Sequence, residues 1–600
     1  MVCVVVDKWQ VVAAIDFGTH GTGWAWATVD AVNNDAHRRI INYKADHRGA
    51  PVVYPKNLSA LFFQDGSVSA RGFEARRRWV RARSAGESGI GYAYAFKMML
   101  KPDAYHGDVP RGEGTVRLAD PHDARHLITE YLRGVYQEVI TDVGKRDYRP
   151  DHIRWCLTVP AIWEQADLRL MRQAAVEAGL PDDEDRLLLA IEPEAAALYC
   201  MVRSNYVLGT DDDREFLELN DGGLASRFMV VDCGGGTIDI TAYKLGRAPD
   251  GSARLSEIGQ PDGGKFGSEY TNAALIDDFL AARLGPDVIA KAKADCAADL
   301  QALQDQWEIE KANVAVEVID GAPRIVDPVM LTVPPALWGL LDEPTRRSLA
   351  DAYGSQWGVV VPEADVQKIF DTMLDPMMDV IRKQLRTMAR NDGPATGPEL
   401  LVVVGGFGRS EYLQARIAAT FKDDARVLLA EDPAGAVMFG AVHYCYNPSV
   451  IRARRARFTL GYQASVLFRQ GVDPLESQFA GDDNELYCTT RFHRLVAKGQ
   501  SVEVDFARRM EVSAASSQTD SVVVRVFETP DDENPEWVTE ANGKLLGTVT
   551  IDLTESIGVP RAERTVELYF YFGNAQTRVR AVNPRTGEEA ETRFEIDYVR

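Results

Sequence analysis

Two short turns in this 600-residue chain place an aspartate, several glycines and a threonine in an order that suits phosphate binding. The first turn, DFGTHGTG, begins at Asp16, and the second, DCGGGT, begins at Asp232; each follows an apolar run that predicts a buried strand. A loop that wraps a phosphate needs inward backbone N–H groups and no Cβ in the way, and glycine meets both needs. The two aspartates suit a magnesium ion held largely through water.

The residues of both turns are candidates for contact with phosphate. The glycines are Gly18, Gly21, Gly23, Gly234, Gly235 and Gly236, and the neighbouring hydroxyl donors are Thr19 and Thr237. Either turn taken alone is typical of an ordinary hairpin. The order of strand, aspartate, glycine turn and second strand occurs twice, with the second strands expected over 24–29 and 237–245. This repetition indicates a duplicated domain.

Two further segments end a buried strand in a residue that could act on a nucleotide. The run LVVVGGFGRS passes through Gly405 and Gly406 into a helix expected to start near Ser410. Such a turn suits a nucleotide's sugar or phosphate, although a tight strand-to-helix turn explains the same glycines. In LLLAIEPEAAALYC, Pro193 favours a helix start, which leaves Glu192 at the end of the strand. That carboxylate is either a helix cap or a catalytic group.

The composition excludes several classes of protein. Apolar residues make up 46% and charged residues 26% of the chain, so large buried cores are available. The net charge of −22 repels phosphate backbones, so we expect no nucleic-acid partner. Seven scattered cysteines without a Cys-x-x-Cys pair indicate a reducing compartment and no zinc framework. The sequence shows no signal peptide and no membrane span, and we expect a cytoplasmic protein.

The sequence pattern changes near residue 450. Before it, apolar strand runs alternate with long helical patterns, which predicts α/β units. After it, short strands of period two are expected at 501–507, 521–528, 545–553, 564–572 and 577–582. We place a domain boundary near 453–457 and read the basic run RARRARF (452–458) as the end of an interdomain helix. An acidic, glycine-rich loop insertion is expected at 209–226.

Together these segments resemble the actin-like ATPase superfamily and, within it, the seventy-kilodalton heat-shock protein chaperones. The resemblance rests on DFGTHGTG, VVDCGGGTIDIT, TVPAIW with IEPEAAAL, and VVVGGFGRS, and it covers about residues 11–445. The region GKLLGTVTIDL through TRFEID is similar to that family's substrate-binding β-domain. GGF in place of the usual GGS and the EPEAAALYC run resemble most the divergent member-12-like branch, which lacks the helical lid.

The resemblance implies a fold and a set of domains. The expected class is α/β, with a duplicated actin-like (ribonuclease-H-like) ATPase domain followed by an all-β sandwich domain. The nucleotide-binding domain would span 1–452, with lobes of roughly 1–225 and 226–452. The substrate-binding-like sandwich would span 457–600.

The resemblance also implies roles for individual residues. Magnesium would be held by Asp16, Asp232 and Glu192. The catalytic set would be Lys97, Glu192, Asp232 and Asp239. The nucleotide would be bound by Gly18, Thr19, His20, Gly234, Gly235, Gly236, Thr237, Glu308, Lys311, Gly405, Gly406, Phe407 and Arg409. The chain departs from the family pattern at His20 and Gly21, at Ala312 in the adenosine clamp, and at Phe407, where a small hydroxyl residue is usual.

The function that the resemblance implies is slow ATP hydrolysis by a chaperone-like protein that uses ATP/ADP and Mg²⁺. Nucleotide state would be coupled to the binding of unfolded or extended polypeptide, or of a specific partner protein, by the C-terminal β-domain. A co-chaperone or exchange factor is a further candidate partner. One alternative is a nucleotide-sensing scaffold with negligible turnover. Another is a small-molecule kinase of the same superfamily, which gives the C-terminal domain no role.

Overall fold

The computed structural model divides into two compact units. The first comprises Met1–Trp163, Leu170–Gly246 and Asp262–Pro448, and the second comprises Glu164–Arg169, Arg247–Pro261 and Ser449–Arg600. The structure describes residues 9–33, 41–50, 52–100, 121–163, 165–202, 227–247, 249, 253–353, 357–394, 397–504, 507–514, 516–529, 535–539, 543–571 and 578–593. The acidic insertion expected at 209–226 lies entirely outside the described residues.

The first sheet of unit 1 is built around the strand that ends in Asp16. It contains β1 (Val11–Phe17), β2 (Gly21–Thr28), β3 (Asn42–Tyr43), β4 (Asn57–Leu58), β8 (Ile153–Val159) and β9 (Leu187–Ile191). The order is β3-β2-β1-β8-β9, with β4 also paired to β2. β1 is antiparallel to β2 and parallel to β8, and β8 is parallel to β9. Every residue of β1 is buried, as its unbroken apolar run predicts.

The second sheet repeats this pairing around the strand that ends with Asp232 and Cys233. Its strands in unit 1 are β10 (Arg227–Cys233), β11 (Ile238–Arg247), β13 (Asp262–Gly264), β18 (Glu399–Val404) and β19 (Ala425–Leu429). β10 is antiparallel to β11 and parallel to β18, and β18 is parallel to β19. Both sheets therefore join an antiparallel hairpin to two parallel strands, and each glycine turn is the hairpin loop.

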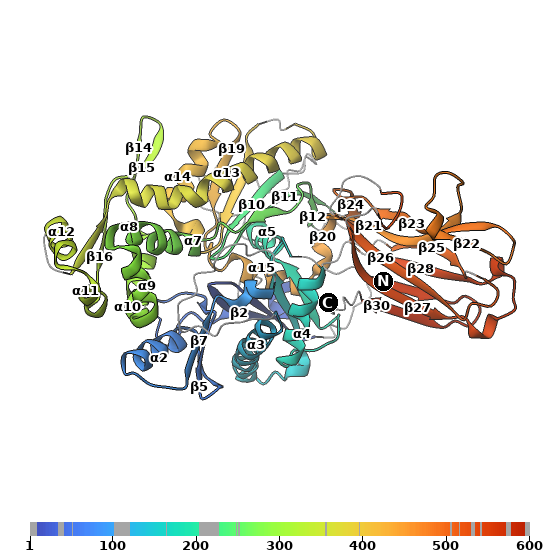
Figure 1. Ribbon diagram of the computed structural model, residues 1–600, viewed down its shortest axis with the longest axis horizontal. Helices are drawn as coiled ribbons and strands as arrows, with labels where there is room; N and C mark the ends of the chain where they lie inside the picture. The colour runs from blue at the N-terminus through green and yellow to red at the C-terminus, as the bar shows by residue number, and fades with distance from the viewer. Residues whose placement is uncertain are drawn as a thin grey trace. The chain divides into compact units, whose positions relative to one another are not determined.

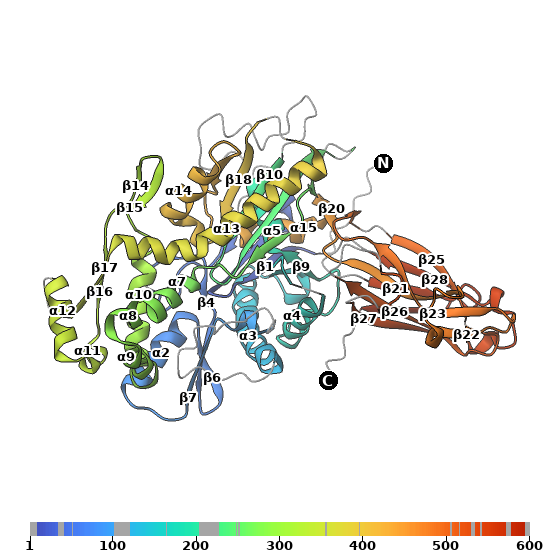
Figure 2. The same cartoon turned by 45° about the horizontal axis from the view of Figure 1, so that its top comes forward.

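Helices flank both sheets (Figures 1 and 2). In both views α3 (Pro121–Gly144) lies beside α4 (Gln165–Glu177), and Arg125 pairs with Glu177. Helix α5 (Glu192–Val202) packs against α15 (Ala436–Tyr446). The long helix α13 (Glu363–Asp392) packs against α14 (Glu411–Thr420), whose N-cap is Ser410. The helix predicted to start near Ser410 is thus confirmed.

The remaining part of unit 1 carries shorter elements. A three-stranded sheet contains β5 (Ala60–Gln64), β6 (Ser67–Arg71) and β7 (Ile90–Tyr94), and α2 (Gly72–Ser84) packs on it. Two hairpins are β14 (Val316–Ile319) with β15 (Ala322–Ile325), and β16 (Val329–Thr332) with β17 (Gly358–Val361). The helices are α1 (Val29–Asn33), α7 (Glu269–Ala273), α8 (Ala281–Leu284), α9 (Pro286–Asp295), α10 (Ala297–Glu310), α11 (Pro335–Leu340) and α12 (Glu343–Tyr353).

Unit 2 consists mainly of strands. One sheet has the order β22-β23-β21-β26-β27 and another the order β25-β28-β29-β30. Their bounds are β21 (Thr459–Leu467), β22 (Gln478–Ala480), β23 (Leu486–Val496), β25 (Ala507–Ser513), β26 (Ser521–Thr529), β27 (Lys544–Asp552), β28 (Thr565–Tyr571), β29 (Arg578–Val582) and β30 (Glu589–Arg593). Side chains of both sheets share one hydrophobic core, in which Tyr462 stacks on Phe570 at 5.9 Å.

The sequence predictions for this region hold in part. The strands expected between 521 and 582 are present as β26 to β29 within the described residues. The basic run is not a helix end: Ile451–Arg455 forms strand β20, which pairs with β12 (Ala253–Glu257) and β24 (Ser501–Glu503). The start of the run alternates as a strand does, with Ile451 and Ala453 buried and Arg452 exposed, and Arg454 is buried as well.

The prediction of a mixed α/β chain is confirmed. Among the residues that the structure describes, no helix is long and apolar enough to span a membrane. The cysteines in this part of the chain are free thiols.

Candidate functional site

The two glycine turns lie against each other. A Cβ built on Gly236 would be 2.6 Å from Thr19 Oγ1, and one built on Gly235 would be 2.5 Å from the Cβ of His20. Any side chain at these two positions would collide with the opposite turn. Glycine is therefore required here for the close approach of the two hairpins.

Gly21 and Gly23 do not belong to the turn. Both lie in β2, which begins at Gly21 and not near residue 24 as expected. A Cβ on Gly23 would be 2.9 Å from Pro55 O and 3.2 Å from Lys56 Cγ, and one on Gly21 would be 3.3 Å from Lys56 Cβ. Protein atoms fill the space that a side chain would need at these two glycines, so glycine is required there for the packing of residues 55–57, and their contact with phosphate stays a prediction.

Buried carboxylates lie at the base of the turns. Asp16 accepts a hydrogen bond from Thr158 Oγ1 at 2.9 Å. Asp232 and Asp239 face each other across the β10–β11 pair, and Asp239 Oδ1 accepts from the Ala161 amide at 3.0 Å. Burial raises the pKa of Asp232 well above its usual value, and the neighbouring carboxylates raise it further. The site thus concentrates negative charge that a cation would stabilise.

Lys97 and Glu192 form a buried ion pair beside these aspartates. Lys97 lies in the 3₁₀ turn Phe96–Leu100, and its Nζ is 2.5 Å from Glu192 Oε1. Glu192 is the first residue of α5, directly after β9, as the sequence predicts. Burial raises the pKa of Glu192 to about 7 even though the charge of Lys97 lowers it. A group with this pKa can take up or release a proton near neutral pH.

A second lysine reaches the same carboxylates and was missed by the sequence analysis. Lys56 Nζ lies 2.6 Å from Asp16 Oδ2. Burial lowers the pKa of Lys56, but the charge of Asp16 and the hydrogen bond to it, together with Tyr54 and the charge of Asp232, raise the pKa above its usual value. Lys56 lies one residue before the two-residue strand β4 and belongs to no glycine motif. The sequence therefore offers no signal for this contact, which depends on the pairing of β4 with β2.

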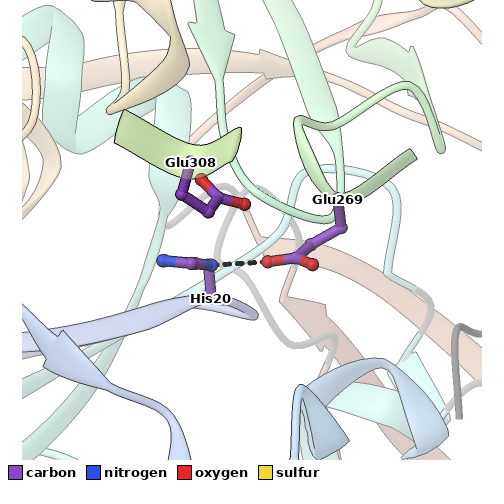
Figure 3. Close-up of side chains that lie close together, drawn as sticks. All are labelled: His20, Glu269 and Glu308. Carbon is purple, nitrogen blue, oxygen red and sulfur yellow. Dashed lines mark hydrogen bonds and ion pairs between the residues drawn. The ribbon is translucent and has the colours of Figure 1, made fainter. Parts of the chain in front are cut away.

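His20, Glu269 and Glu308 converge from three separate segments: the β1–β2 turn, α7 and α10 (Figure 3). His20 Nδ1 lies 2.5 Å from Glu269 Oε1 and 2.6 Å from the Tyr94 hydroxyl. Burial would raise the pKa of Glu269, but the hydrogen bond with His20 and nearby positive charge lower it to about 2. The predicted clamp residue Glu308 is thereby linked to the predicted phosphate turn.

Neighbouring protein groups compensate the negative charge of the two glutamates in the cluster around Glu308. One ligand atom from each of His20, Glu269 and Glu308 lies within 4.8 Å of the others. Asn272 donates to both glutamates, at 3.0 Å to Glu269 and 2.5 Å to Glu308. Lys311 Nζ is 2.8 Å from Glu308 Oε1 and also contacts Asn272 Oδ1 at 3.0 Å. We therefore assign this cluster as a polar link between segments rather than as a metal centre.

The third glycine turn packs on the second hairpin. Gly405 has φ of +85°, and a Cβ there would lie 2.5 Å from Asp232 Oδ1. A Cβ on Gly406 would lie 2.5 Å from the Tyr54 hydroxyl. Arg409 is exposed at the end of the following 3₁₀ turn. Phe407 is buried instead and stacks on Phe370 of α13 at 6.0 Å, so its ring stabilises the turn from within.

The comparisons with known proteins agree with the sequence motifs. No family model matches the chain. It is 27% identical to human heat shock 70 kDa protein 12A over 516 aligned positions, covering 77% of this chain and 73% of that protein. It is 26% identical to the mouse 12A protein (97% and 90% covered) and 25% identical to human heat shock 70 kDa protein 12B (99% and 91%). The chain is thus similar to the heat shock 70 kDa 12 proteins over most of its length. The predicted resemblance to the member-12-like branch is thereby confirmed.

The donor set of this heat-shock-70-like chain fits a hard divalent cation. Asp16, Asp232, Asp239 and Glu192 present carboxylate oxygens, the ligands that Mg²⁺ prefers. Burial and, after it, repulsion by the neighbouring carboxylates raise the pKa of Asp232, and a bound cation would relieve that repulsion. Lys56 already neutralises the Asp16 side of this set. Heat-shock-70-like proteins are generally ATPases, and the charge pattern here is compatible with that chemistry.

Proposed function

We propose that the chain binds ATP and ADP at the junction of the two glycine turns and hydrolyses ATP slowly. The observation that carries this proposal is the contact of the turns, Thr19 with Gly236 and His20 with Gly235, above the paired aspartates. Two loops of backbone N–H groups that meet over buried carboxylates suit a phosphate chain and its metal ion. The matching strand patterns of the two sheets support a duplicated actin-like ATPase domain.

The chain's own residues supply the remaining requirements of phosphoryl transfer. Such a reaction depends mainly on positioning and charge stabilisation. In this proposal Lys97 stabilises negative charge on the γ-phosphoryl oxygens, and Glu192 and Asp239 orient the attacking water. Magnesium bound by Asp16, Asp232 and Glu192 would neutralise the phosphates. Because the pKa of Glu192 is about 7, this residue can accept the proton of the water near neutral pH.

The test of nucleotide binding is calorimetric titration of the full chain with ATP and ADP in the presence of Mg²⁺. Saturable heat with one nucleotide per chain supports the proposal. No heat with either nucleotide would overturn it. Product analysis then separates hydrolysis from a kinase reaction, since hydrolysis releases inorganic phosphate and a kinase transfers it to a hydroxyl group.

The second candidate is a nucleotide-sensing scaffold with negligible turnover. It is favoured by one observation: both buried lysines near the carboxylates already have acidic partners, Lys97 with Glu192 and Lys56 with Asp16. Single-turnover MgATP hydrolysis, with and without an unfolded polypeptide, distinguishes the two. Tight ATP binding without cleavage would favour the scaffold.

For unit 2 we propose a substrate-binding β-sandwich that captures unfolded or extended polypeptide or a specific partner protein. The support is an exposed apolar row that crosses its first sheet and ends on the edge strand β22. Leu467 of β21 and Phe479 of β22 both lie opposite Tyr487 of β23, and they are 58% and 39% exposed. An edge strand with apolar side chains suits the addition of an extended peptide. A cytoplasmic location and a co-chaperone or exchange factor remain predictions.

A further inference from the structure

Helix α2 carries a concentration of arginines on a chain whose net charge is −22. Five of its thirteen residues are arginines, and Glu74 is its single acidic residue. Arg76 points inward, where it is buried and pairs with Asp305 of α10 at 2.7 Å. The other four arginines are half-buried or exposed. Positive charge is thus gathered on one helix of a protein that is acidic overall.

Three of these arginines form a stripe on the side of α2 that faces solvent. Arg81 follows Arg77 by four residues and Arg78 by three, so their side chains lie one turn apart on one face of the helix. The buried residues of α2, which include Trp79, lie on the opposite side and pack into the core formed with β5 and β7. The stripe is therefore not part of the packing that holds the helix in place.

A fourth arginine joins the stripe from another segment. Arg48 Nε lies 3.7 Å from Glu74 Oε2, and the Arg48 side chain is 76% exposed. The segment of Arg48 is packed against the start of α2, because a Cβ on Gly49 would lie 3.3 Å from the carbonyl carbon of Phe73. We refer to Arg48, Arg77, Arg78 and Arg81 together as the arginine face.

The positive charge of the arginine face is only partly neutralised. Glu74 accepts hydrogen bonds from Arg77 at 2.8 Å and from Arg78 at 2.9 Å. The hydrogen bond from Arg78 and the charges of Arg48 and Arg77 lower the pKa of Glu74, which keeps this carboxylate ionised. Arg81 is exposed and has no ion-pair partner in the described part of the chain. Four guanidinium groups and one carboxylate leave a net charge of +3.

The contacts of Glu74 show which ligand chemistry suits the arginine face. Guanidinium groups are planar and present forked N–H donors that match a carboxylate. One carboxylate is already bound in this way by Arg77 and Arg78. Arg77 and Arg81 are about one helical turn, roughly 5.4 Å, apart along the helix axis. Carboxylates at positions i and i+4 of a partner helix have the same spacing.

The surroundings favour a polypeptide over a larger polyanion. Nucleic acid or an anionic membrane would extend beyond the arginine face and would be repelled by a chain of net charge −22. Within the described residues, none of the exposed large apolar side chains belongs to α2, so this helix has no side chain of that kind to insert into a bilayer. A short acidic segment can reach the arginine face without bringing further negative charge near the rest of the protein.

We propose that the arginine face docks an acidic segment of a partner protein, with glutamate or aspartate side chains one helical turn apart. This binding needs no nucleotide, so the proposal stands or falls independently of the proposed ATP chemistry. It adds a second binding surface to the chain, on α2 of unit 1 and apart from the apolar row of unit 2.

The first test uses a fluorescein-labelled peptide of about sixteen residues, with glutamate at every fourth position and alanine and glutamine elsewhere. Fluorescence anisotropy with the full chain, without nucleotide, compares this peptide with one in which each glutamate is replaced by glutamine. We expect saturable binding of the glutamate peptide and at least about tenfold weaker binding of the glutamine peptide. A rise in NaCl from about 50 to about 250 mM should weaken binding about fivefold. Equal affinities for the two peptides, or no binding of the glutamate peptide, would overturn the proposal.

The second test reverses the charge of the arginine face. The variant Arg77→Glu/Arg81→Glu should bind the glutamate peptide about tenfold or more weakly than the wild type. The matched control is Arg347→Glu on α12, because Arg347 is 75% exposed and pairs with Glu343 of its own helix at 3.0 Å. This control should bind as the wild type does. Unchanged affinity in the folded charge-reversal variant would overturn the proposal.

Circular dichroism checks that the charge-reversal variant is folded. If it is not, Arg81→Gln replaces it, since Arg81 has no ion pair within the described residues to lose. We expect this variant to bind the glutamate peptide about threefold more weakly, and unchanged affinity would again overturn the proposal.

The third test compares the peptide with other polyanions. A short DNA duplex and vesicles that contain phosphatidylserine are titrated at the same salt concentration. We expect both to bind the wild type more weakly than the glutamate peptide does. Tighter binding of either one, lost in Arg77→Glu/Arg81→Glu, would overturn the assignment of an acidic polypeptide and identify nucleic acid or membrane as the ligand.

Discussion

His20 Nδ1 lies 2.5 Å from Glu269 Oε1, and this contact joins the hairpin turn of the first sheet to the helix that follows the second hairpin. The two residues are 249 positions apart in sequence. His20 stands where the seventy-kilodalton heat-shock proteins, which the sequence resembles, usually have a threonine. The contact of His20 with Glu269 is therefore a departure of this chain from the family pattern. Because this contact lies beside the two glycine turns, it would connect the proposed nucleotide binding to the relative position of the two sheets.

Replacing His20 should weaken the closed arrangement of unit 1. In His20→Ala, Glu269 loses a charge-assisted partner, and we expect the free energy of unfolding to fall by about 2 kcal/mol. Release of bound labelled ADP should become faster. Denaturant unfolding and stopped-flow fluorescence measure the two effects. The control is Thr345→Ala, at the start of helix α12, which should leave the rate of ADP release unchanged. Equal rates of ADP release from the wild type, His20→Ala and Thr345→Ala would contradict a role for the His20–Glu269 contact.

The ionised form of Glu269 should stabilise the folded protein, and the pH dependence of the free energy of unfolding should show this contribution. Its pKa is lowered to about 2 in the folded protein from an ordinary value of 4.5. The unfolded chain therefore takes up the proton first as pH falls, so the stabilisation is complete above pH 4.5 and is lost toward pH 2. The difference in unfolding free energy between the wild type and Glu269→Gln should shrink over this range. Glu343→Gln, an exposed site, should show no such trend.

Hydrolysis should depend on the ionised form of Glu192. Because its pKa is about 7, the single-turnover rate should rise with pH through this value. Glu192→Gln should remove this rise and lower the rate by about a hundredfold or more. The charge of Lys97 lowers the pKa of Glu192, and Lys97→Met removes that charge. The rise of any residual rate with pH should therefore move to a higher pH than in the wild type. A wild-type rate that is flat between pH 6 and 8 would contradict this role.

The contact of the two turns can be tested by adding one methyl group. In Gly236→Ala the new Cβ would lie 2.6 Å from Thr19 Oγ1, so the turns must separate. We expect ATP affinity to fall about tenfold by calorimetry. Gly246→Ala is the matched control, because a Cβ at that position meets no atom within 4 Å. Equal ATP affinity of the two variants would show that the turn contact does not support binding.

Peptide capture should depend on the apolar row of unit 2. Leu467→Glu on β21 and Phe479→Glu on the edge strand β22 each place a charge beside Tyr487 of β23. Fluorescence anisotropy with extended apolar peptides should show an affinity about tenfold lower for each variant of the full chain. Val523→Glu, a 45% exposed site on β26, should bind as the wild type does. Unchanged binding in all variants would place the peptide site elsewhere.

The sequence motifs predicted the strands, turns and helix starts of the candidate site better than those of the neighbouring segments. The strands that lead to Asp16 and Asp232, the helix start at Glu192 and the N-cap at Ser410 depend on residues adjacent in sequence, and the structure has all of them. The strand β20 was missed because a run of arginines gave no helical or strand signal beyond two apolar residues. The start of β2 was missed because glycines at 21 and 23 are typical of turns.

The sequence by itself determined which residues stand at strand ends and turns, since these follow from local periodicity and from the conformational needs of glycine and proline. Only the tertiary structure decided that Lys56 reaches Asp16, that His20 reaches Glu269, and that Phe407 turns inward onto Phe370. Each of these contacts joins segments far apart in the chain. Their distances depend on sheet pairing and helix packing, which no local pattern of residues records.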